Sequence, residues 1–210
     1  MTSDTATTEN TMTPWEQLRA EALECTRCPL AQERQQVVFG EGPVPCDFLF
    51  IGQGPSESDD ATGRNYNGPS GEVLDKALTQ AGLSRANIYV TNITLCAAFE
   101  GSGKPRKLRP PKAAEVRTCR PWLDQQLALI KPRIIVCSGA VAAREVIDRK
   151  FKLAEQRGQW FDGPHNTRII ATWQPAYLMR LSQHDRPRAV EGWRQLVDDL
   201  RQAANAIAAT

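Results

Sequence analysis

Four short apolar runs recur along the chain, and most are followed by a segment with helical periodicity. The runs are continuously apolar, which is typical of strands buried on both faces of a sheet. They span residues 47–51, 88–91, 133–137 and 168–172. Helical spacing of apolar residues predicts helices over 15–24, 70–81, 112–130, 140–147 and about 186–206. Strands alternating with helices predict an α/β fold, here a single three-layer α/β/α domain with a four-stranded, mainly parallel central sheet.

The composition fits one folded domain behind a short polar tail. The chain has 210 residues, of which 41% are hydrophobic and 24% charged, so collagen-like, coiled-coil and wholly disordered chains are excluded. Residues 1–13 are polar and rich in threonine, and we expect a disordered tail in front of a domain over 14–210. No apolar run could span a bilayer and no basic-then-apolar leader opens the chain, so we expect a cytoplasmic protein without a membrane partner.

Polar groups follow the strands at what should be one edge of the sheet. In open parallel sheets, ligands bind beyond the carboxyl ends of the strands, where this chain has Gly52, Asn92, Ser138 and Gln174. The loop after the first strand is rich in glycine but matches neither a Walker motif nor a dinucleotide fingerprint. Nucleotide hydrolysis and hydride transfer are therefore disfavoured.

Three acids lie in the same loop region, at the mouth of the expected cleft: Glu57, Asp59 and Asp60. A compact acidic group can position a water molecule or stabilise a cation. A solvated acidic loop explains the same pattern equally well.

Six cysteines without an export signal indicate free thiols or a metal site rather than disulfides. Four of them have positions suited to a shared site: Cys25, Cys28, Cys96 and Cys119. Four thiolates can hold zinc or an iron–sulfur cluster, and the spacing does not separate the two. Cys137 lies inside an apolar run and Cys46 in a proline-rich turn, so we assign neither to a metal.

The small total charge of +2 hides a strongly basic segment. Residues 104–120 contain seven basic side chains and one acid, a net charge of +6, which leaves −4 for the rest of the chain. Proline residues stiffen this segment, which lies between two of the proposed cysteine ligands. It would attract phosphate groups, although a solvated surface face is the alternative.

Several motifs in one order carry a family resemblance. They are CTRCPL at 25–30, GQGPS at 52–56, GRNYNGPSG at 63–71, YVTNITLC at 89–96, CRPWL at 119–123 and QPAYLMR at 174–180. Together they resemble the uracil-DNA glycosylase superfamily, and most closely its iron–sulfur branches, family four and the covalent-trapping group. The match runs from about residue 24 to the last helix.

The resemblance implies a cofactor and a base pocket. It implies that a [4Fe-4S] cluster is ligated by Cys25, Cys28, Cys96 and Cys119. It also implies that a base flipped out of DNA stacks on Tyr66 and pairs with the Asn92 amide, while the loop containing Gly52 and Gly54 directs backbone N–H groups at its carbonyl.

The sequence departs from the family pattern at two positions. Family four usually has Glu and His where this chain has Gln53 and Gln174. A neutral Gln174 can still donate a hydrogen bond to the leaving base. Asp60 therefore becomes the preferred group for placing water and stabilising the oxocarbenium-like sugar, with Asp59 and Glu57 in reserve.

The resemblance implies a monofunctional glycosylase of base excision repair, which hydrolyses the bond to uracil in DNA and leaves an abasic site. A glycosylase for hypoxanthine or xanthine and a non-excising DNA-binding protein are the alternatives. We expect a monomer associated with the nucleoid. The expected DNA contacts are Lys104, Arg106, Lys107, Arg109 and Arg180.

Overall fold

The computed structural model describes residues 12–101 and 106–208 and confirms the α/β fold. The four predicted strands are present and parallel: β1 (Phe48–Gly52), β2 (Tyr89–Asn92), β5 (Ile134–Ser138) and β7 (Arg168–Thr172). They form the centre of a five-stranded sheet in the order β2-β1-β5-β7-β6. The expectation of a disordered tail falls mainly on residues 1–11, which lie outside the described residues.

Three short strands were not predicted. β6 (Trp160–Asp162) pairs antiparallel with β7 at the sheet edge, so the sheet is mixed and has one strand more than expected. β3 (Phe99–Glu100) and β4 (Lys107–Leu108) form a separate antiparallel pair. These strands have two or three residues and are half-buried or exposed apart from Phe99, so they lack the continuous apolar run that marks a buried strand.

The helices agree closely with the predicted ranges where a prediction was made. They are α1 (Pro14–Leu23), α2 (Leu30–Glu33), α3 (Glu57–Thr62), α4 (Pro69–Gln80), α5 (Ala113–Ile130), α6 (Ala140–Val146), α7 (Leu153–Gln156), α8 (Pro175–Ser182) and α9 (Arg186–Ala208), with 3-10 turns η1 (Arg85–Asn87) and η2 (Pro164–Asn166). None of the helices in the described part of the chain is both long and apolar enough to cross a membrane.

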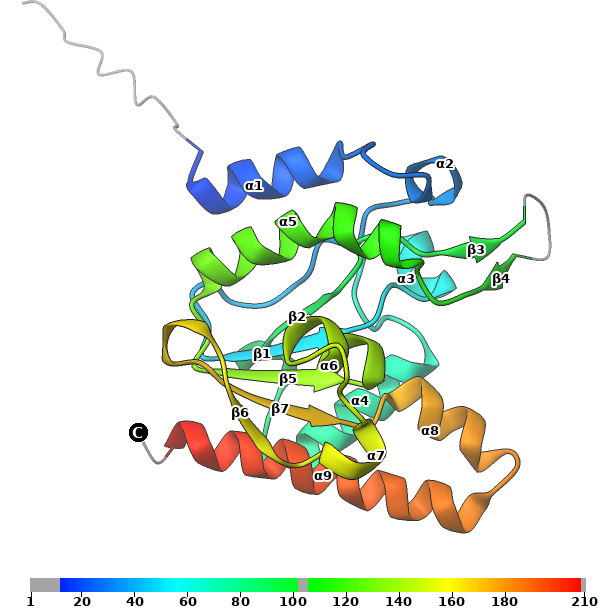
Figure 1. Cartoon of the computed structure of the whole chain (residues 1–210), viewed down its shortest axis with the longest axis vertical. Helices are drawn as coiled ribbons and strands as arrows, with labels where there is room; N and C mark the ends of the chain where they lie inside the picture. The colour runs from blue at the N-terminus through cyan, green and yellow to red at the C-terminus, as the bar shows by residue number, and fades with distance from the viewer. Residues whose placement is uncertain (1–11, 102–105, 209–210) are drawn as a thin grey trace, which may run out of the picture.

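Alternate residues of the strands pack on opposite faces of the sheet. Phe48 and Phe50 of β1 face α4, α8 and α9, whereas Leu49 and Ile51 face α5 and α6. The helices therefore cover both faces, as Figure 1 shows with α9 below the sheet and α5 above it. Burying each such side chain contributes about 1.5–3 kcal/mol to stability.

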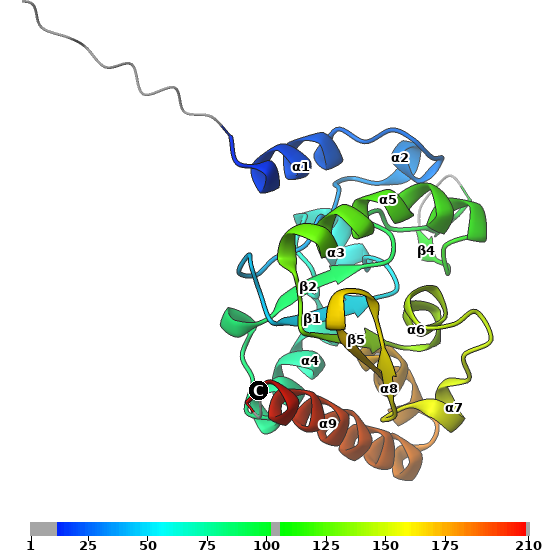
Figure 2. The same cartoon turned by 60° about the vertical axis from the view of Figure 1, so that its left-hand side comes forward.

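A further layer lies outside α5. Helix α1 packs against α5, and Figures 1 and 2 both show α1 and α2 on the far side of α5 from the sheet. Thr13 caps α1, since its side chain accepts from the backbone of Glu16 while the Glu16 carboxylate accepts from the backbone of Thr13. A small cluster containing Leu18, Leu30 and Trp122 joins this layer to the domain, and it also contains the four cysteines of interest.

Candidate active site

The structure brings the predicted loops together at the carboxyl edge of the sheet. Gly52 at the end of β1 is in register with Asn92 at the end of β2, and Ser138 is in register with Thr172 on the other side. Gln174 follows as the first residue before α8. The expected arrangement of strand ends is therefore confirmed.

A cleft of about 390 Å³ opens at this edge. Among its walls are seven residues singled out by the sequence: Gln53, Gly54, Asp59, Tyr66, Arg109, Gln174 and Arg180. Gly139 supports the Gln174 side, because its φ of 89° is a left-handed conformation and a Cβ there would lie 3.2 Å from the Gln174 Cβ. Gly52 and Asn92 are buried beside the cleft and do not themselves form its wall.

Tyr66 is held in an unusual backbone conformation. Its φ of 51° is left-handed, and its ring meets Phe50 edge-on at a centroid distance of 5.6 Å. The hydroxyl donates to Ser138 Oγ at 3.5 Å, and burial raises the pKa of Tyr66 to about 12, so the phenol stays neutral. Gly71 allows the first turn of α4 to approach, because a Cβ there would collide with the Tyr66 carbonyl.

Asn92 is only 1% exposed and is paired with a residue that the sequence did not single out. Its Nδ2 donates to Oδ1 of Asn65 at 2.6 Å. Its Oδ1 has no hydrogen-bond partner among the described residues. A buried acceptor left unpaired is costly, which indicates an atom kept available for a ligand.

The side chains of the neighbouring residues Asp59 and Asp60 lie in different surroundings. Asp59 lines the cleft, and its two oxygens accept from the backbone N–H groups of Ser56 at 2.9 Å and Asn67 at 2.7 Å. Asp60 is fully buried away from the cleft, where it accepts from Arg106 at 3.0 Å and from the backbone of Gln35 at 2.9 Å. Asp59, the reserve candidate from the sequence, therefore borders the cleft, and the preferred Asp60 does not.

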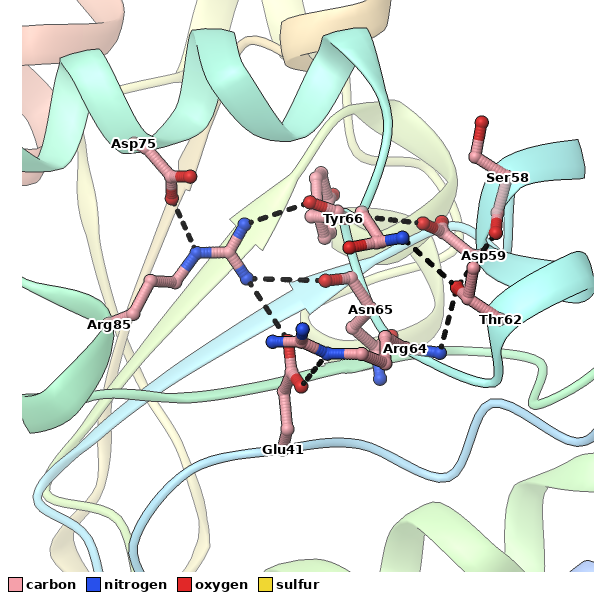
Figure 3. A network of polar contacts seen from close by, with 10 residues as sticks. Glu41, Ser58, Asp59, Thr62, Arg64, Asn65, Tyr66, Asp75 and Arg85 are labelled. Atoms are coloured by element: carbon pink, nitrogen blue, oxygen red, sulfur yellow. Dashed lines mark hydrogen bonds and ion pairs between the residues drawn. The ribbon is translucent and has the colours of Figure 1, made fainter.

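Arg85 binds the backbone of the Tyr66 loop, as Figure 3 shows. Its guanidinium donates to the carbonyls of Asn65 at 3.3 Å and Tyr66 at 3.1 Å, and pairs with Asp75 at 2.6 Å and Glu41 at 3.7 Å. Sequence reasoning missed Arg85 and Asn65. Arg85 acts on backbone carbonyls some twenty residues away, a contact that no local pattern records.

The basic segment divides into inward and outward residues. Arg106 is packed over the Phe99 ring at 3.5 Å, bonded to Asp60 and the Glu33 carbonyl, and mostly buried. Arg109 forms a bidentate pair with Glu115, which lowers the pKa of that carboxyl, yet it also reaches the cleft. Lys107 and Arg180 are exposed. Lys104 lies outside the described residues.

The thiol region consists of Cys25, Cys28, Cys96 and Cys119 with the side chains around them. All four cysteines line one small cavity between α1, α2 and α5, while Cys46 and Cys137 lie in the core of the sheet. N–H groups point at three of the sulfurs: Trp122 Nε1 donates to Cys25 at 3.3 Å, Arg34 to Cys96 at 3.4 Å, and the Leu95 backbone to Cys119 at 3.3 Å.

The donor set fits an iron–sulfur cluster. Within residues 12–101 and 106–208, no three His, Cys, Asp or Glu side chains are arranged as a site for a metal ion. The four thiols nevertheless share one cavity with apolar walls, and N–H donors to sulfur are the groups that stabilise cluster thiolates. The chemistry of this donor set therefore suits an iron–sulfur cluster.

Comparison with known proteins points to the same family. The model of the uracil DNA glycosylase superfamily matches residues 39–198. A type-4 uracil-DNA glycosylase from Thermotoga maritima is 34% identical over 79% of this chain and 83% of its own length. One from Pyrobaculum aerophilum is 31% identical over 74% and 80%, and a type-5 enzyme from that organism is 28% identical over 60% and 66%. The chain belongs to the uracil-DNA glycosylase superfamily.

Proposed function

We infer that this protein excises uracil from DNA by hydrolysing the bond between base and sugar, leaving an abasic site for base excision repair. Membership of the superfamily and the type-4 relatives support this activity. The observation that carries it is the unpaired Oδ1 of Asn92 beside a cleft at the carboxyl edge of the sheet. Uracil has a ring N–H that such a buried acceptor can pair with, whereas cytosine has none there.

A base must leave the DNA helix before it can enter the cleft, which costs a few kcal/mol of unstacking. Stacking on Tyr66 and pairing with Asn92 offset this cost. The left-handed backbone of Tyr66 and its contacts with Arg85 hold the ring in place before the base arrives. The binding energy is therefore not spent on ordering the pocket.

Breaking the glycosidic bond leaves negative charge on the base and positive charge on the sugar. Gln53 and Gln174 border the cleft and supply neutral donors toward the departing base. Asp59 supplies the carboxylate that stabilises the sugar and orients water, because it borders the cleft and Asp60 does not. Asp60 instead anchors Arg106 and, through it, the strand pair β3–β4.

Cys25, Cys28, Cys96 and Cys119 hold a [4Fe-4S] cluster in this proposal. The cluster supplies a structural cross-link rather than a catalytic group. The residues around it shield the sulfurs, and the N–H groups of Trp122, Arg34 and Leu95 balance their negative charge. The link joins the outer layer of α1 and α2 to α5.

DNA phosphates meet Lys104, Lys107, Arg109 and Arg180 in this proposal. Arg109 and Arg180 border the cleft, and Lys107 lies on the exposed strand pair beside it. Arg106 contributes indirectly by holding that strand pair. The protein acts as a monomer in the cytoplasm, associated with the nucleoid.

One assay tests the activity. Purified, iron-containing protein is incubated at enzyme excess with oligonucleotides that contain uracil, hypoxanthine or xanthine, and the strands are then treated with alkali. We expect cleavage at uracil. Cleavage only at hypoxanthine or xanthine would support the second candidate function, for which the two glutamines at the cleft are the favouring feature. Intact strands throughout would leave only DNA binding and would refute excision.

A further inference from the structure

Two buried asparagines, Asn65 in the Tyr66 loop and Asn92 at the end of β2, contact each other, and neither is fully paired. Asn65 and Asn92 are each 1% exposed, and their amides share a hydrogen bond of 2.6 Å. Asn92 Oδ1 and Asn65 Nδ2 have no partner in the part of the chain that the structure describes. Most buried polar atoms in proteins are paired, so two orphans in one amide pair require an explanation.

The free oxygen of Asn92 lies against the backbone of Gly52, next to the base-stacking residue. A Cβ at Gly52 would collide with this oxygen and with the Tyr66 hydroxyl. Only glycine gives these two groups room at the carboxyl end of β1. The orphan acceptor therefore lies directly beside Tyr66 and the start of the loop that leads to Gln53, both of which line the cleft.

The shared hydrogen bond couples the orientations of the two amides. If the Asn92 amide rotated alone, its oxygen would face the Asn65 oxygen and the bond would be replaced by a repulsive contact. Asn92 therefore cannot turn its nitrogen toward a base unless Asn65 turns as well. An asparagine without such a neighbour can rotate freely, and would present an acceptor or a donor with little preference.

The backbone of Asn65 is also held in place, by a residue other than Asn92. Arg85 donates to its backbone carbonyl and to that of Tyr66, and is in turn bound by Asp75 and Glu41 (Figure 3). The amide pair therefore rests on a fixed loop rather than a mobile one.

We propose that Asn65 is a positioning residue that holds the Asn92 amide with its Oδ1 free, so that Asn92 accepts from a base edge with a ring N–H beside a carbonyl. This inference rests on the proposed role of Asn92. Uracil, hypoxanthine and xanthine present such an edge, whereas cytosine and adenine present a ring nitrogen acceptor beside an amino group. Deamination of cytosine and of adenine converts the second edge into the first, so the held amide separates uracil and hypoxanthine from their parent bases.

The test measures base discrimination in binding, which a merely structural role would not alter. Fluorescence anisotropy gives the Kd for single-stranded oligonucleotides containing 2′-fluoro-2′-deoxyuridine or 2′-fluoro-2′-deoxycytidine, both of which resist excision. We expect the wild-type protein to prefer the uracil strand. Asn65→Leu keeps the side-chain shape but removes the lock, and should reduce the ratio of the two Kd values about tenfold to a hundredfold.

Two further variants make the result decisive. Asn67→Ala is the matched control, because Asn67 lies in the same loop and its side chain bonds only to Thr62 in the described structure, so the ratio should not change. Asn65→Asp serves if Asn65→Leu does not fold by circular dichroism. Its carboxylate can only accept, so it still binds Asn92 Nδ2, and the ratio should stay at or above the wild-type value.

The outcomes separate this inference from the function it rests on. Asn92→Ala should also abolish the preference, and the effects of Asn65→Leu and Asn92→Ala should not add, because they remove one unit. An unchanged ratio in folded Asn65→Leu, or a lost preference in folded Asn65→Asp, with loss in Asn92→Ala, would overturn the role of Asn65 alone. An unchanged ratio in Asn92→Ala, or no preference in the wild-type protein, would overturn both.

Discussion

The base cleft and the thiol region hold their functional side chains by different means. In the cleft, ion pairs and hydrogen bonds fix the loop: Arg85 binds two backbone carbonyls and Asp59 binds two backbone N–H groups. In the thiol region, four sulfurs from three separate parts of the chain meet among apolar side chains. The cleft is therefore preorganised by the chain itself, whereas the proposed cluster would cross-link the thiol region. Excision should be sensitive to the first region and stability to the second.

The largest effect on excision should come from Asn92→Ala. The variant removes the only acceptor proposed for the uracil N–H, and we expect the single-turnover rate to fall about 10²–10³-fold. Asn87→Ala is a control on an exposed residue of η1 and should retain the wild-type rate. A wild-type rate in Asn92→Ala would show that Asn92 does not recognise the uracil base.

The two neighbouring carboxylates offer a matched pair of variants. Asp59→Asn should lower the single-turnover rate about tenfold to a hundredfold, because it removes the charge that borders the cleft. Asp60→Asn should instead lower stability by about 3 kcal/mol, measured by urea unfolding, because it leaves Arg106 without its buried partner. The opposite pattern would restore Asp60 as the catalytic carboxylate.

Arg85→Gln tests whether the fixed loop matters for the rate. Without the guanidinium the carbonyls of Asn65 and Tyr66 lose their donor, and we expect kcat/KM for uracil excision to fall about tenfold. Arg64→Gln is the control, because Arg64 is 65% exposed and pairs with Glu41 on the same side of the loop. Equal kcat/KM values in the two variants would mean that Arg85 does not hold the loop in the geometry that excision requires.

The smallest effect on excision should come from the thiol region. Cys119→Ser should abolish iron binding and the absorbance near 400 nm, and should lower the Tm clearly, while the rate at a temperature where the variant is folded falls only a few-fold. Cys46→Ser, at a buried thiol outside this region, should retain its iron. Retained iron in Cys119→Ser, or stoichiometric zinc without iron in the wild-type protein, would contradict the proposed cluster.

Features that depend on a local sequence pattern could be predicted, whereas those that depend on contacts between distant residues could not. The four core strands are continuous apolar runs buried on both faces, so their pattern is local and was identified correctly. The grouping of the four cysteines followed from their motifs. The orientation of Asp59 and Asp60 could not be predicted, because adjacent residues of a short helix point in different directions and only the packing of Arg106 decides which one is buried.

Asn65 and Arg85 could not be identified from the sequence because their contacts are with residues far away along the chain. Asn65 acts through a side chain at the end of a strand 27 residues away, and Arg85 through backbone carbonyls, which carry no residue identity. Arg106 shows the converse: a basic residue in a basic segment was assigned to phosphate, but an aromatic ring and a carboxylate hold it inside the fold.

The most direct test is the amount of free uracil released from uracil-containing DNA by folded, iron-containing wild-type protein at enzyme excess, measured by mass spectrometry. We expect one uracil to be released for each abasic site formed, with no strand cleavage before alkali treatment. Tight binding of the same DNA without any release of uracil would contradict it.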